Sequence, residues 1–176
     1  MSRTPMSART RSGLLRRTGL ASAGVVTLVV ATVAPMSGAS AVTKLTDAQA
    51  AAQLSAVGIT RSSSGGCTNR NNSTCTSYEQ INQSTVDGIK TYKSVSGCAV
   101  NITGGTETGH ASGTYSHWNG YKVDISRSTC NDSYITSHYS YIGYRSDGYP
   151  MYQAASGNVY TNEGSHWDIV YYSCGC

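Results

Sequence analysis

Residues 116–125 read SHWNGYKVDI, and this stretch decides which kind of fold the chain can form. In residues 121–125, apolar side chains alternate with Lys122 and Asp124, which is the period of a half-buried β-strand. The Asn-Gly pair just before this strand is typical of a two-residue turn between paired antiparallel strands. The stretch therefore predicts a hairpin in which His117 faces Lys122.

Outward from this hairpin, the same period of two predicts further strands. They cover residues 99–103, 140–144, 158–161 and 168–173. Helices are predicted only before the strands, and this order favours an α+β fold with a small, mostly antiparallel sheet and two or three helices.

Two of these helices can be delimited from their end signals. Thr46 and Gln49 fit a capping box, and the apolar positions that follow, up to Val57, predict a short helix that stops at Gly58. A second helix is predicted over residues 84–97, with a glycine at its end.

The beginning of the chain has the composition of an export signal. Basic residues come first, an apolar run covers residues 20–36, and residues 39–41 read ASA, an A-x-A cleavage pattern. We therefore expect a signal peptide over 1–41 and a secreted, extracellular mature protein over 42–176. An uncleaved anchor helix is the alternative, and the Arg16-Arg17 pair leaves both the general and the twin-arginine export route open.

The chain length of 176 residues suits one core of ordinary size. Residues 42–176 are expected to form one domain and a monomer, with residues 42–77 as its N-terminal helix and polar loop. Much of the excess of 13 basic over 9 acidic side chains lies in the signal segment, so the mature part is close to neutral. This balance excludes a basic nucleic-acid surface, and after cleavage no membrane contact is expected.

All six cysteines lie in the mature part, and an even number in a small exported domain predicts three disulfides. They are Cys67, Cys75, Cys98, Cys130, Cys174 and Cys176. Cys67 and Cys75 flank a polar loop and are expected to bond to each other. A bond between Cys174 and Cys176 would be strained, so each of them is expected to bond to Cys98 or Cys130, in an order left open.

Two of the four histidines stand in surroundings that favour a metal site. The predicted hairpin places the Cα atoms of His117 and Asp124 about 7–8 Å apart, close enough for both side chains to reach one ion. Downstream, the Gly-Ser pair between Glu163 and His166 allows a bend that directs both side chains to one site. Two imidazoles, one carboxylate and a nearby glutamate are typical of a catalytic Zn²⁺ site with a general base.

The pattern H-x-x-G-x-x-x-D followed by E-x-x-H resembles that of the zinc D-Ala-D-Ala carboxypeptidases and dipeptidases, which share their fold with hedgehog signalling domains. The matching residues are His117, Gly120, Asp124, Glu163 and His166. The resemblance covers about residues 84–172. It implies that His117, Asp124 and His166 bind Zn²⁺, that Glu163 is the catalytic base, and that the substrate is a peptide of bacterial cell-wall peptidoglycan, cut by a D,D-carboxypeptidase or an endopeptidase.

The sequence departs from this family at two places. Tyr115 stands where a serine usually precedes the first histidine, and the turn at residues 103–107 lacks the arginine that holds substrate. Arg145, in a similar motif further downstream, is the candidate to replace it, with His110 and Trp167 as further substrate contacts. The departures are compatible with cleavage inside a peptide. They also leave open a non-catalytic secreted wall-binding or inhibitor protein on the same scaffold.

Overall fold

The structure is a computed structural model that describes residues 42–174. The predicted signal peptide over 1–41, with its cleavage pattern, lies outside the described residues, as does Cys176. Within the described part, no helix combines the length and the apolar character needed to cross a membrane.

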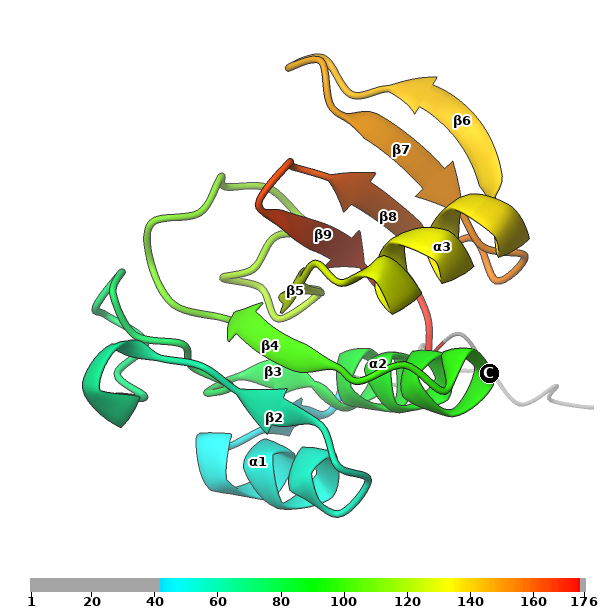
Figure 1. Cartoon of the computed structure of the whole chain (residues 1–176). Helices are drawn as coiled ribbons and strands as arrows, with labels where there is room; N and C mark the ends of the chain where they lie inside the picture. Colours follow the sequence, from blue (N-terminus) through cyan, green and yellow to red (C-terminus); the bar gives the residue numbers. More distant parts are fainter. Residues whose placement is uncertain (1–41, 175–176) are drawn as a thin grey trace, which may run out of the picture. The chain divides into compact units, whose positions relative to one another are not determined.

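A seven-stranded sheet forms the centre of the molecule, in the order β2-β4-β5-β9-β8-β7-β6 (Figure 1). Its strands are β2 (Thr60–Arg61), β4 (Asn101–Gly104), β5 (Lys122–Ser126), β6 (Ser140–Tyr144), β7 (Pro150–Gln153), β8 (Val159–Asn162) and β9 (His166–Val170). In this sheet β2 and β4 are parallel and the other neighbours are antiparallel. The predicted α+β class with a mostly antiparallel sheet is confirmed.

The short strands β1 (Lys44–Leu45) and β3 (Ile81–Asn82) form a separate antiparallel pair. Four strands were not predicted from the sequence, namely β1, β2, β3 and β7. Three of them have two residues each, too few to show a period of two, and β7 begins with Pro150, which is unfavourable inside a strand.

Both predicted helices are present. Helix α1 (Asp47–Ser55) begins at the expected capping box, in which the Thr46 hydroxyl accepts from the Gln49 N–H. The helix ends earlier than expected, so Val57 lies beyond it and is exposed rather than on its apolar face. Helix α2 (Gln83–Ser96) ends at Gly97, whose φ of 66° is left-handed.

A third helix, α3 (Thr129–His138), was not assigned from the sequence, because its polar residues give no apolar period. The short helix η1 (Ser64–Gly66) completes the elements.

The β5–β9 pair has one apolar and one polar face, because side chains alternate along each strand. Ile125 and Trp167 are fully buried in the core, which α2 and α3 cover. In that core the Tyr92 ring of α2 contacts the Tyr134 ring of α3. The polar side chains of β5 and β9 project to the other face, where the candidate site lies.

Two disulfides join the described residues. Cys67–Cys75 was predicted and is confirmed, with Cα atoms 5.1 Å apart. The second bond, Cys98–Cys130, corrects the prediction that these two cysteines bond to Cys174 and Cys176. The tertiary structure explains this pairing, because the segment that follows α2 packs against the start of α3. Tyr92 of α2 donates a hydrogen bond to the Asn131 side chain of α3.

The predicted two-residue hairpin at Asn119-Gly120 does not form. Residues 105–121 are instead an irregular connection, in which the Gly120 N–H donates to the His117 carbonyl. The Gly120 carbonyl accepts from the Asn82 N–H and the Thr85 hydroxyl, so the turn packs on the start of α2 rather than on a strand partner. His117 therefore reaches the site from a loop and does not face Lys122 across a hairpin.

Candidate metal centre

A polar pocket of about 490 Å³ lies over the polar face of β5 and β9. Its lining combines three histidines, four carboxylates and two basic side chains. The carboxylates outnumber the fixed positive charges, so the pocket favours a cation.

His117 and Asp124 form the centre of this pocket, and both are almost fully buried. His117 Nε2 lies 3.3 Å from Asp124 Oδ1. Its other ring nitrogen, Nδ1, donates to the Gly105 carbonyl oxygen at 2.7 Å, which leaves the lone pair of the neutral ring on Nε2. The lone pair and the carboxylate therefore face each other, an arrangement that a cation between them stabilises.

The hydrogen bonds of Asp124 support the same conclusion. Its Oδ1 is buried and has no hydrogen-bond partner among residues 42–174, which is rare for a buried polar atom. Burial lowers the pKa of His117, but Asp124, Asp168 and the hydrogen bond to the Gly105 carbonyl together raise it overall. The site thus favours positive charge at the point where the two side chains meet.

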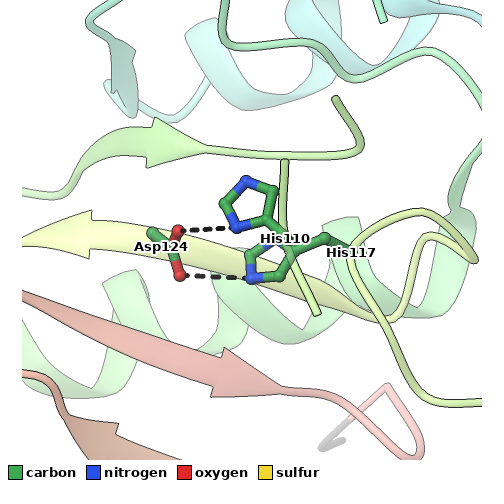
Figure 2. Close-up of side chains that lie close together, drawn as sticks. All are labelled: His110, His117 and Asp124. Atoms are coloured by element: carbon green, nitrogen blue, oxygen red, sulfur yellow. Dashed lines mark ion pairs between the residues drawn. The ribbon is translucent and has the colours of Figure 1, made fainter. Parts of the chain in front are cut away.

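His110 adds a second imidazole to this pair (Figure 2). Its ring is stacked on that of His117, with 3.8 Å between centroids, and its Nδ1 lies 3.8 Å from Asp124 Oδ2. One ligand atom from each of His110, His117 and Asp124 can be chosen so that all lie within 4.8 Å of one another. The sequence predicts His110 as a substrate contact, and in the structure it belongs to the group that can hold a metal ion.

His166 approaches the same carboxylate from the hairpin between β8 and β9, and Glu163 lies beside His166. The Glu163 N–H donates to the His166 carbonyl, and Gly164 adopts a φ of 82°, so the expected bend is a tight turn. His166 Nε2 lies 3.7 Å from Asp124 Oδ1 and 3.1 Å from Glu163 Oε2. The structure thus brings all four predicted residues of the metal site into one pocket.

Arg145 lies in this pocket, but its guanidinium is occupied by carboxylates. It forms ion pairs with Asp147 at 2.7 Å, with Asp168 at 3.2 Å and with Glu163 Oε1. The hydrogen bonds that Arg145 donates to carboxylates, above all to Asp147, raise its pKa despite partial burial. Arg145 therefore positions Glu163.

Trp167 lies elsewhere. Its ring is fully buried in the core, and its Nε1 donates to Asp132 Oδ1 of α3 at 2.8 Å. Because a buried ring cannot line a cleft, its predicted substrate contact is corrected to a role in packing α3 on the sheet.

Sequence reasoning missed two acidic residues at the site. Asp168 accepts from Lys122 at 2.7 Å; burial raises the pKa of Asp168, but Lys122, His117 and Arg145 together lower it below its usual value. Glu107 accepts from His110 Nε2 at 3.1 Å. His166 and Asp168 are two residues apart on one strand, so their side chains lie on the same face, and this spacing could have placed Asp168 at the site. Glu107 lies in a loop, where no periodic pattern indicates the direction of its side chain.

The spacing of His117 and Asp124 is suited to a divalent metal ion. A tetrahedral ion with ligand bonds of about 2.0–2.2 Å sets neighbouring ligand atoms about 3.4 Å apart, and the distance from His117 Nε2 to Asp124 Oδ1 is 3.3 Å. Imidazole and carboxylate are both ordinary zinc ligands. Comparisons of the chain with protein-family models, with curated proteins and with solved structures found no match.

Proposed function

We propose that this protein is a secreted zinc-dependent peptidase that hydrolyses peptide bonds of bacterial cell-wall peptidoglycan. The observation that carries the metal is the buried Asp124 Oδ1, which has no hydrogen-bond partner among the described residues and is approached by Nε2 of both His117 and His166. The substrate class rests on the resemblance of the His117, Asp124, Glu163 and His166 spacing to the zinc D-Ala-D-Ala peptidases.

In this proposal His117, Asp124 and His166 hold the ion. When bound, zinc would polarise the peptide carbonyl and lower the pKa of a water to about 7. Glu163 is the base: its Oε2 faces the pocket beside His166, and it accepts the proton of the attacking water and returns it to the leaving amine. Arg145 holds the other carboxylate oxygen, Oε1, and so fixes the direction in which Oε2 points.

The occupation of Arg145 favours the endopeptidase over the carboxypeptidase. A carboxypeptidase must bind the terminal carboxylate of its substrate, and a guanidinium is the usual partner because it binds carboxylates through two hydrogen bonds. Arg145 already binds three carboxylates of the protein, and Lys122 is paired with Asp168. Cleavage inside a peptide, which needs no such contact, is the better match.

The test measures bound metal and released amines in the same preparation. We expect one zinc ion per mature chain, and new amino groups from purified peptidoglycan that a chelator suppresses. Glu163→Gln is expected to keep the zinc and to lose activity about 10²–10⁴-fold, the usual contribution of a general base. His138→Ala, on the exposed end of α3, is the matched control and should behave as the wild type. Protein that binds no zinc after refolding with zinc would refute the proposal.

A non-catalytic wall-binding or inhibitor protein is the second candidate. The occupation of Arg145 by carboxylates of the protein favours it, because that guanidinium is then not free to hold a substrate. This candidate predicts zinc binding and sedimentation with purified wall material, without release of amines by either the wild type or Glu163→Gln.

A further inference from the structure

The Trp118 ring is exposed to solvent and yet held in one position. Trp118 is 44% exposed, whereas Trp167 is fully buried. The Arg70 guanidinium lies over the Trp118 ring, 3.7 Å from its centroid, and donates hydrogen bonds to the backbone carbonyls of Thr106 and Trp118. A side chain that is already fixed loses little conformational entropy when a ligand stacks on it. The ring is therefore preorganised for binding on the side that Arg70 leaves open.

Trp118 forms part of the wall of a cavity of about 260 Å³, which we call the Trp118 pocket. The rest of this wall consists largely of glycines and of residues with hydroxyl or amide side chains, among them Thr108, Gly109, Ser112, Gly113 and Asn119. Asn119 Nδ2 donates to the carbonyls of Gly113 and Thr114, at 2.9 Å and 3.2 Å, and so fixes this part of the wall. The pocket thus combines a flat aromatic surface with polar groups, as ligand sites usually do.

The Trp118 pocket continues into the candidate metal pocket, because Gly109 and His110 line both cavities. The His110 ring is stacked on the ring of His117, which precedes Trp118 in the chain. One extended substrate can therefore occupy both cavities, with the bond to be cleaved beside Asp124 and another part of the molecule against Trp118.

The charges around the Trp118 pocket distinguish between the two components of peptidoglycan. Its stem peptides carry free carboxylates, whereas its glycan strands are chains of N-acetylated amino sugars. Among residues 42–174, no lysine or arginine lines the pocket, but the Glu107 carboxylate does, and it disfavours an anion. A sugar ring, in contrast, offers C–H groups that pack on an aromatic face, and hydroxyl and amide groups that suit a wall with serine and threonine hydroxyls.

We propose that the Trp118 pocket binds a sugar ring of the glycan strand, while the peptide attached to that strand lies in the metal pocket. This inference rests on the proposed function, which supplies the peptidoglycan substrate. The sugar stacks on the face of Trp118 that Arg70 does not cover. The contact gives the protein a preference for peptides that are still joined to glycan over free peptides of the same sequence.

The test measures saccharide binding, which does not depend on activity, in the zinc-loaded protein and again after treatment with a chelator. The probe is the linear trimer of N-acetylglucosamine, which contains no peptide and no carboxylate. Calorimetry should detect binding in both cases, and the trimer should change the tryptophan fluorescence, because Trp118 is exposed.

Variants locate the binding site. Trp118→Ala should weaken trimer binding about tenfold or more, the usual effect of truncating a tryptophan on which binding depends. Trp118→Tyr keeps an aromatic ring and should weaken binding less. Tyr144→Ala is the matched control, because it removes an exposed aromatic ring that does not line the pocket, and it should bind the trimer as the wild type does.

The possible failures can be told apart. No trimer binding by the wild type, or equal affinity in the wild type and Trp118→Ala, would overturn the sugar site and leave the proposed peptidase intact. Binding of a free stem peptide but not of the trimer, weakened by Trp118→Ala, would also overturn it and assign the pocket to peptide. Trimer binding by a protein that takes up no zinc would support the sugar site and refute the peptidase. If Trp118→Ala does not fold, the fluorescence of the wild type decides: a change on adding trimer supports the site, and no change overturns it.

Discussion

Asp124 of β5 and Asp168 of β9 lie directly opposite each other in an antiparallel strand pair, and both carboxylates are buried. Like charges at such positions destabilise a sheet. Lys122 and Arg145 pair with Oδ2 of Asp168, whereas Asp124 faces imidazoles and no lysine or arginine among the described residues; each carboxylate keeps a buried Oδ1 without a hydrogen bond in that part of the chain. The sheet therefore carries an electrostatic cost at Asp124 that a bound cation removes.

Asp124→Asn is expected to abolish zinc-dependent stabilisation. A ligand that binds only the folded state at 100 times its Kd adds about 2.7 kcal/mol to the free energy of unfolding. The wild type should gain about this much from zinc in urea unfolding experiments, and Asp124→Asn should gain none, because the amide has no charge. Asp87→Asn, on the surface of α2, is the control and should gain as much as the wild type. Equal stabilisation of Asp124→Asn would exclude this carboxylate as a ligand.

Gly104→Ala should displace the carboxylate without unfolding the sheet. Gly104 pairs with Asp124 across β4 and β5, and a Cβ at this position would clash with the Asp124 carboxyl group. Since the contact is with a side chain, Asp124 can turn away while the backbone stays. Zinc affinity, measured by calorimetry, is expected to fall about tenfold or more. Retained zinc affinity would show that the position of the Asp124 carboxylate is not critical. Thr103→Ala on the same strand is the control and should bind zinc as the wild type does.

Trp167→Phe tests the correction to the predicted substrate contacts. The variant loses the hydrogen bond to Asp132 and part of the core volume, so the free energy of unfolding should fall by about 1–3 kcal/mol. Zinc affinity and the KM for peptidoglycan fragments should not change. A raised KM at unchanged stability would return Trp167 to the substrate site.

Asp132 should contribute to the acid sensitivity of the fold. Hydrogen bonds from Arg127, and to a smaller extent from Trp167, lower the pKa of Asp132 despite partial burial. The stabilisation is therefore present above the unfolded pKa, about 3.9, and is lost as the pH falls through the lower folded value. Because the pair is partly exposed, it contributes no more than about 1 kcal/mol.

Asp132→Asn keeps an oxygen for Trp167 but loses the ion pair with Arg127. It should be less stable than the wild type at pH 7, and this difference in stability should shrink as the pH falls below the unfolded pKa of about 3.9, because the wild-type carboxyl becomes protonated. Urea unfolding at a series of pH values measures this difference. If the difference in the free energy of unfolding stayed constant down to pH 2, the loss of stability in Asp132→Asn would come from packing and not from charge.

Local sequence was sufficient for features that depend on neighbours along the chain. The capping box at Thr46, the end of α2 at Gly97 and the alternation in β5 each need only a few residues, because helix caps, left-handed glycines and the two faces of a strand are local properties. The convergence of Glu163 and His166 was predictable for the same reason, since only a two-residue turn separates them.

Tertiary structure alone decided how distant segments meet. Glu107 and His110 join the candidate metal centre because residues 105–117 fold back over β5, and no periodic pattern in that loop predicts its path. Cys98 bonds to Cys130 because α2 and α3 pack together on one face of the sheet. Segment-to-segment packing of this kind depends on the complementary shapes of buried surfaces, which a linear pattern of residue types does not contain.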